Sequence, residues 1–273
     1  MNFINQIEGQ IEKNNSLLCI GLDPVKEKMP QHLFESPDAF FEFNKSIIDQ
    51  THDLVAAFKP NLAFYAANGI EGFGALEKTI EYINKEYKTP VILDGKLADI
   101  GNTSEAYAKF VFDILKVDAV TVNPYMGTDS LEPFLKRSEK GVIVLCHTSN
   151  EGSADLQDIW IADRNTFNYV LVAEKIVEWQ AEYGNCMMVV GATYPDQLEY
   201  LREVSEEMFF LVPGIGVQGG NLEKVMRVGL RSDKSGLLIN SARSILYAGV
   251  GRDFAEKARV EAGKIRDEIN KYR

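Results

Sequence analysis

The sequence TPVILDGKLAD occupies residues 89–99, where an apolar run ends in two carboxylates that flank an amine. An unbroken apolar run of this kind is typical of a short strand that is buried on both faces. We expect the strand at residues 90–94, so that Asp94 and Lys96 point to the same side of its C-terminal end. Asp99 must then lie in the loop that follows. For the triplet in isolation, the simplest interpretation is a salt bridge that closes a strand.

The same order of apolar run, polar exit and helix recurs along the chain. Strands are expected at residues 17–23, 55–59, 90–94, 118–122, 141–146, 187–191, 208–212 and 236–240. Helices are expected at residues 36–53, 72–87, 103–116, 168–183, 195–205 and 254–273 and from residue 128 onward, with an extra helix at residues 3–13. Buried strands that alternate with helices predict an α/β fold, a (β/α)8 TIM barrel. We expect a single domain over residues 1–273, with the extra N-terminal helix closing one end.

An open, doubly wound sheet is the alternative fold. It would need neither eight regularly spaced strands nor a helix after the last one.

Composition restricts the partners and the compartment. The chain of 273 residues carries a formal net charge of −11, so its surface should repel nucleic acid. No apolar run approaches the roughly 20 residues needed to span a bilayer, and the N-terminus lacks an apolar signal segment. We therefore expect a cytoplasmic protein that binds neither nucleic acid nor membrane. Cys19, Cys146 and Cys186 lie in or beside apolar runs, which favours buried, reduced thiols.

Unusual polar residues occur where the predicted strands end. In a barrel of this kind the active site lies at the C-terminal ends of the strands. One mouth is therefore expected to gather Asp23, Lys59, Asp94, Lys96, Ser149, Gln218 and Arg243. Each residue alone has a structural explanation, such as a turn acid or a loop hydroxyl. Bringing these polar and charged groups together costs desolvation free energy. A purely structural role would not require that cost, so the cluster favours a functional site.

The exits of the last two strands predict a phosphate site. Residues 213–220 read PGIGVQGG, and glycines at such a loop let backbone N–H groups approach a ligand closely. Arg243 follows the next strand and would add a forked cation to this site, and Gln218 could close over the phosphate from the opposite side.

On the other side of the mouth, Lys59, Asp94 and Lys96 form a row of alternating charge that Asp99 could extend. The row is already charge-balanced, so the sequence predicts no metal ion there. Lys96 lies between carboxylates and should stay protonated, which favours a general acid over a Schiff-base nucleophile.

With these residues in place, the chain resembles the orotidine 5′-phosphate decarboxylase family, and within it the longer of two sequence groups. The family's D-x-K-x-x-D-I-x-x-T signature is matched by Asp94, Lys96, Asp99, Ile100 and Thr103. Further matches are Asp23 in GLDP, Lys59 in FKP, and the segments VNPYMG, TSN and PGIG at residues 122–127, 148–150 and 213–216. Sister decarboxylases and aldolases share the signature, so it is specific only together with the other matches.

The resemblance implies cofactor-free loss of CO2 from orotidine 5′-monophosphate to give UMP. Lys96 would stabilise and protonate the carbanion at C6 of the pyrimidine, while Asp94 faces the departing carboxylate. In the same family pattern, ribose is bound by Lys59 and Asp23, the pyrimidine edge by Ser149, and the phosphate by Gly216, Gln218 and Arg243. Asp99 and Thr103 would reach the site of a neighbouring subunit, which implies a homodimer with shared active sites.

Two other functions stay open at this point. A sister-branch sugar-phosphate enzyme would use Mg²⁺, but such sites place a carboxylate where Lys59 stands. A non-catalytic phosphate-binding barrel would have no use for the charged row. The loop at residues 147–167 is long enough to be a lid or to be disordered. The sequence does not decide whether His147 or Asn150 in this loop faces the ligand.

Overall fold

The computed structural model describes residues 2–215 and 219–273, and its central feature is a parallel sheet of eight strands. The strands are β1 (Leu18–Leu22), β2 (Ala57–Pro60), β3 (Ile92–Leu97), β4 (Ala119–Val122), β5 (Gly141–His147), β8 (Cys186–Val190), β9 (Phe210–Val212) and β10 (Leu237–Ser241). They are ordered β2-β1-β10-β9-β8-β5-β4-β3. The parallel bridges Phe58 to Val91 and Asn61 to Asp94 join the two end strands. The sheet therefore closes on itself, and the predicted TIM barrel is confirmed.

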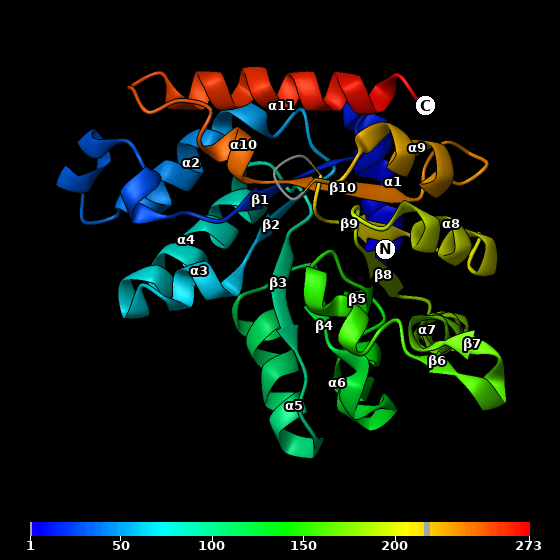
Figure 1. The fold of residues 1–273 in the computed structure, drawn as a ribbon. Helices are drawn as coiled ribbons and strands as arrows, with labels where there is room; N and C mark the ends of the chain where they lie inside the picture. Colours follow the sequence, from blue (N-terminus) through cyan, green and yellow to red (C-terminus); the bar gives the residue numbers. More distant parts are fainter. Residues whose placement is uncertain (1, 216–218) are drawn as a thin grey trace.

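Helices surround this barrel on the outside (Figure 1). They are α1 (Phe3–Asn14), α2 (Ala39–Thr51), α3 (Leu62–Ala66), α4 (Gly69–Glu86), α5 (Gly101–Lys109), α6 (Thr128–Leu135), α7 (Asn168–Tyr183), α8 (Pro195–Val204), α9 (Leu222–Gly229), α10 (Arg243–Leu246) and α11 (Phe254–Asn270). A π-helical turn, η3 (Phe110–Ile114), continues α5 and ends the helix expected at residues 103–116. The short helices α3 and α10 were not predicted, because about one turn gives too few residues to show a 3.6-residue period. Helix α9 was not predicted either, although it is as long as α6.

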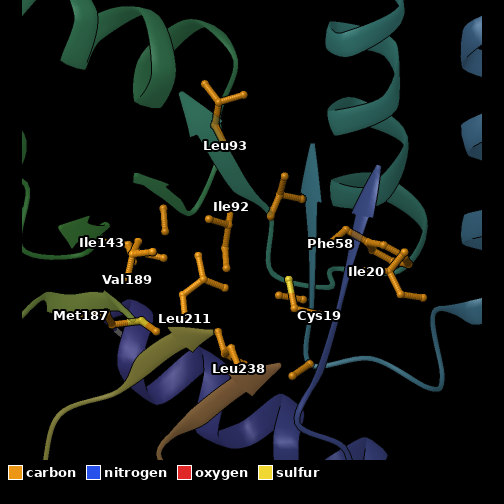
Figure 2. Close-up of a cluster of buried hydrophobic side chains, with 14 of the residues drawn as sticks. Cys19, Ile20, Phe58, Ile92, Leu93, Ile143, Met187, Val189, Leu211 and Leu238 are labelled. Carbon is orange, nitrogen blue, oxygen red and sulfur yellow. The ribbon is translucent and has the colours of Figure 1, made fainter. Parts of the chain in front are cut away.

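The space between the strands is filled by apolar side chains. Figure 2 shows Cys19, Ile92, Ile143, Val189 and Leu211 gathered there, and each is at most 5% exposed. Inward-pointing aliphatic residues of this type make the centre of such a barrel a packed core. All three cysteines are buried and free, as the sequence predicts.

Helix α1 packs across the N-terminal end of the barrel, which confirms the expected extra helix. The Phe3 ring is fully buried there. A Cβ added to Gly141 at the start of β5 would lie 2.2 Å from the Cδ1 atom of this ring. Glycine at position 141 is therefore required for α1 to pack against the start of β5.

The long loop after β5 is ordered, so it is not the structureless segment that its length allowed. It contains the helical turns η5 (Glu151–Asp155) and η6 (Ala162–Arg164). After η5 comes a small antiparallel hairpin of β6 (Trp160–Ile161) and β7 (Thr166–Phe167), and η6 is the turn that joins its two strands. Among the helices of the described residues, none combines the length and the apolar character needed to cross a membrane.

Candidate active site

A pocket of about 530 Å³ opens at the C-terminal ends of the barrel strands. Its floor takes side chains from every strand of the barrel: Asp23 just after β1, then Lys59, Asp94, Thr121, Leu145, Val189, Leu211 and Asn240. The floor is polar along β10, β1, β2, β3 and β4 and apolar along β5, β8 and β9. A pocket of this volume, with convergent polar groups on one half and an apolar surface on the other, is suited to a small-molecule ligand.

Asp94 is at the centre of the polar half. Its Oδ2 lies 2.8 Å from Lys59 Nζ and accepts a hydrogen bond from Asn61 Nδ2 at 3.2 Å. Its Oδ1 lies 2.6 Å from Lys96 Nζ and accepts a hydrogen bond from Thr121 Oγ1 at 2.9 Å. Four donors thus converge on one carboxylate, and the predicted row of Lys59, Asp94 and Lys96 exists as a contiguous network.

The charges in this network shift its pKa values. Burial alone would raise the pKa of Asp94, but the positive charges of Lys59 and Lys96 hold that pKa well below its usual range. Burial likewise opposes the charge on Lys59, yet Asp94 and Asp23 raise its pKa above the usual lysine value. Asp94 and Lys59 are therefore both ionised at neutral pH.

Lys96 reaches Asp94 from a strained backbone. Its φ of 49° lies in the left-handed region, which costs a residue with a side chain on the order of 1 kcal/mol. The ladder between β3 and β4 is irregular at this point, with Leu93 paired to Val120 and Leu97 to Val122. Lys96 therefore lies within a bulge, and bulges are known to redirect side chains beside active sites. Its side chain is 48% exposed towards the pocket, compared with 12% for Asp94.

Asp23 lines the pocket next to this row, and its buried negative charge is less well balanced by neighbouring donors than that of Asp94. Its Oδ1 is buried, with no hydrogen-bond partner among residues 2–215 and 219–273. Burial raises the pKa of Asp23, Lys59 opposes the shift, and the negative charge of Asp94 adds to it. Its backbone is fixed by Tyr247, whose hydroxyl donates to the Asp23 carbonyl at 2.9 Å. Because Asp23 lines the pocket, its carboxylate is available to a ligand that donates hydrogen bonds.

The exits of β9 and β10 form the opposite wall. Pro213, Gly214 and Ile215 line the pocket after β9, and Arg243 lines it after β10. Gly214 has a φ of 100°, and its carbonyl accepts a hydrogen bond from Gly220 N at 3.0 Å. This turn needs glycine because of the positive φ. The predicted residues Gly216 and Gln218 lie outside the described residues.

The loop after β5 covers one side of the pocket. Ser149 and Asn150 both line it, together with Gln157 from η5's C-terminal flank. The Gln157 side chain holds the loop start, since its Oε1 accepts a hydrogen bond from Thr148 N at 2.8 Å. His147 is fully buried instead, with Nε2 3.0 Å from Asp158 Oδ1. Of the two residues that the sequence left undecided, Asn150 is therefore the one that faces the pocket.

Asp99 and Thr103 lie apart from this pocket. Asp99 Oδ1 accepts a hydrogen bond from Ile100 N at 2.8 Å, and Thr103 is exposed on α5. Among the described residues that line the pocket, neither of the two occurs. The structure thus brings together six of the predicted site residues, which are Asp23, Lys59, Asp94, Lys96, Ser149 and Arg243.

Comparison with known proteins identifies the family. The sequence model described as the orotidine 5′-phosphate decarboxylase / HUMPS family matches residues 16–258. The chain belongs to this family. A relative from Flavobacterium johnsoniae, an orotidine 5′-phosphate decarboxylase, is 50% identical over 265 residues that cover 97% of this chain and 96% of the relative. The corresponding protein of Cellvibrio japonicus is 47% identical over 274 residues, covering 99% of this chain and 98% of the relative.

Solved structures of the family agree with this assignment. The structure of Leishmania donovani OMP decarboxylase is 39% identical and superposes with a TM-score of 0.86, covering 100% of this chain and 99% of the other. These likenesses confirm the predicted family and the barrel that the pattern of strands and helices predicted, and with them the decarboxylase class of activity.

Two residues of this family member's site escaped the sequence reasoning. Asn61 and Thr121 both bond Asp94, although they lie 33 and 27 residues away along the chain. Asn61 directly follows the FKP segment, so its position at a strand exit could have drawn attention to it. Thr121 gave no such signal, because threonine within a strand is ordinarily explained by β propensity.

Proposed function

We propose that the chain decarboxylates orotidine 5′-monophosphate to UMP in this pocket, without a metal ion or an organic cofactor. The observation that carries the proposal is the network of Lys59, Asp94 and Lys96. It offers an ammonium group half exposed to the pocket and a carboxylate kept ionised at its side. Two lysines neutralise Asp94 within hydrogen-bond distance, so the network supplies positive charge without a cation from solution.

The chemistry breaks the bond between C6 of the pyrimidine and its carboxylate carbon. The electron pair stays on C6, in an orbital that cannot delocalise into the ring, so stabilisation has to come from charges fixed nearby. The Lys96 ammonium supplies that charge and then transfers one proton to C6, which gives UMP and CO2. The neutral amine regains its proton from solvent. Asp94 faces the departing carboxylate and holds Lys96 in position between turnovers.

The rest of the pocket binds the nucleotide. Lys59 and Asp23 bind the ribose hydroxyls, and the Asp23 carboxylate lines the pocket where it can accept a hydrogen bond from one of them. Ser149 binds the pyrimidine edge. Arg243, with Gly216 and Gln218, binds the phosphate, which lies across the pocket from the reacting carbon. Binding energy from this remote group can be used at C6, as expected for an enzyme of this kind.

The proposal includes a homodimer with shared active sites. Asp99 and Thr103 lie outside their own pocket and extend from the exit of β3. The same region exposes Ile100 at 58% and Tyr125 at 82%, a pattern suited to burial against a second copy. Under a two-fold axis, Asp99 and Thr103 of each chain complete the site of the other. We also place the protein in the cytoplasm, since its three free, buried cysteines suit a reducing compartment.

The direct test follows the ultraviolet absorbance of orotidine 5′-monophosphate with the purified protein. The spectrum should change to that of UMP, at a rate proportional to protein concentration. Binding of UMP without any spectral change would instead favour a phosphate-binding sensor. Incubation with EDTA should leave the rate unchanged. A rate that EDTA abolishes and Mg²⁺ restores would contradict the metal-free site.

A further inference from the structure

Thr121 is the β4 residue that faces the bulge of β3. Between Leu93 and Leu97 the chain of β3 advances four residues, while its partner β4 advances only two, from Val120 to Val122. Thr121 alone therefore lies opposite the segment from Asp94 to Lys96, where the regular ladder is interrupted. It is 1% exposed, and its side chain points to the pocket floor.

The Thr121 hydroxyl makes two hydrogen bonds whose directions are both determined. Lys96 N lies 3.0 Å from Thr121 Oγ1 and can only donate, so the hydroxyl accepts there. Asp94 Oδ1 lies 2.9 Å away on an ionised carboxylate that can only accept, so the hydroxyl donates its single proton to it. One hydroxyl thus links the backbone of Lys96 to the carboxylate that receives the Lys96 side chain.

We propose that Thr121 is a positioning residue for the reaction, which aims the Lys96 ammonium by holding the strained backbone of Lys96 against Asp94. The inference rests on the proposed decarboxylation. Thr121 itself touches no reacting atom and acts only through Lys96 and Asp94.

The need for such a residue follows from the geometry of Lys96. Its backbone has a φ of 49°, a conformation that persists only where the surroundings hold it. Its side chain is half exposed and has Asp94 as its ion-pair partner. A shift of the backbone would therefore displace the ammonium from C6, and misplacement of about 1 Å is costly in catalysis. Valine at position 121 would fill nearly the same volume but would make neither hydrogen bond.

The experiment compares Thr121→Val with Thr121→Ser in the full chain. For Thr121→Val we expect kcat to fall at least tenfold, with the affinity for UMP within threefold of the parent. Thr121→Ser keeps the hydroxyl and should retain at least a third of the parent kcat. Thr51→Val is the matched control, because Thr51 is also fully buried and donates to the Ile47 carbonyl of α2, remote from the pocket. Its kcat should equal that of the parent.

Selective loss of kcat with intact UMP binding supports positioning, since a merely structural role would lower UMP binding and thermal stability together. If Thr121→Val keeps more than a third of kcat, the inference is wrong. If Thr121→Val does not fold, the inference is tested by comparing kcat between Thr121→Ser and Thr121→Ala, because both lack the methyl group and differ only in the hydroxyl. Equal kcat for these two would also overturn it. An inactive parent protein, by contrast, would contradict the proposed function itself.

Discussion

Lys96 Nζ lies 2.6 Å from Asp94 Oδ1, although the backbone between the two residues is a bulge and not a regular strand. Simple alternation of side chains predicts that the two residues share a face, and they do meet. The contact nevertheless depends on a left-handed residue at position 96 and on bonds from neighbouring strands. Because the ion pair joins the candidate proton donor to the candidate carboxylate, it is the first contact to test.

Removal of the Lys96 amine should abolish turnover while the fold is retained. We expect Lys96→Ala to lower kcat/KM by far more than tenfold, because one group both stabilises and protonates the carbanion. Steady-state kinetics measure the loss, and UMP binding shows that the pocket survives. Lys136→Ala is the control, since its side chain is 63% exposed and pairs with Glu132 on α6. Activity of Lys96→Ala above a tenth of the parent, a loss under about 1.4 kcal/mol, would refute the assignment.

The shared site predicts complementation between two inactive variants. Lys96→Ala and Asp99→Ala should each be nearly inactive as homodimers. After subunit exchange, each heterodimer contains one site with both defects and one site with neither, so up to half of its sites should recover. The measurement is kcat after mixing, with exchange followed independently by mass spectrometry of the intact dimers. Mixtures that exchange subunits but regain no activity would show that Asp99 does not act in the neighbouring site.

Asp23→Asn should stabilise the fold and weaken substrate binding. The folded state raises the pKa of Asp23, mainly through burial, so it binds the proton more tightly than the unfolded chain does. The ionised group consequently reduces stability as the pH rises from the unfolded pKa through the folded one. At pH 7 we expect the free energy of unfolding to increase by about 1 kcal/mol or more. This gain should shrink as the pH falls and Asp23 becomes protonated.

Urea unfolding over a pH series measures this effect. Asp53→Asn is the control with the opposite expected effect, a loss of stability at pH 7. Hydrogen bonds from Arg259 lower the pKa of Asp53, so its ionised form stabilises the fold. Loss of stability on Asp23→Asn at pH 7 would show that a group of the pocket compensates the buried carboxylate after all.

Gly141→Ala should destabilise the barrel without altering the site. The new Cβ would lie 2.2 Å from the Phe3 ring and 2.7 Å from Ala119 Cβ, so α1 or β5 has to move. Overpacking of this kind costs about 1–3 kcal/mol. Thermal unfolding measures the cost, while kcat per folded molecule should stay at the parent value.

Gly9→Ala is the matched control within α1. Its added Cβ meets no atom within 4 Å, so higher helix propensity should stabilise the protein by roughly 0.5–1 kcal/mol. Equal stability of the two variants would show that the seating of α1 is not tight.

Much of this molecule could be predicted from local patterns in the sequence. The barrel strands are short runs that are mostly apolar and, apart from the C-terminal half of β3, largely buried, so their residues identify them without knowledge of their neighbours. The C-terminal ends of parallel strands meet at one mouth, and this rule alone brings Asp23, Lys59, Asp94 and Arg243 to a common pocket. The signature at residues 94–103, together with the matches around Asp23 and Lys59 and at residues 122–127, 148–150 and 213–216, also predicted the family that the comparisons confirm.

The details of the site were decided only by the tertiary structure. The bulge at Lys96 exists because β3 and β4 pair in two registers, and no property of either strand alone specifies that shift. Thr121 on β4 and Asn61 just after β2 contact Asp94 from 27 and 33 residues away, so no local period could reveal them. His147 and Asn150 are only three residues apart, yet His147 ends β5 and is buried, whereas Asn150 in the following loop lines the pocket. Local sequence determines which segments become strands, whereas closure of the barrel determines which of their side chains meet.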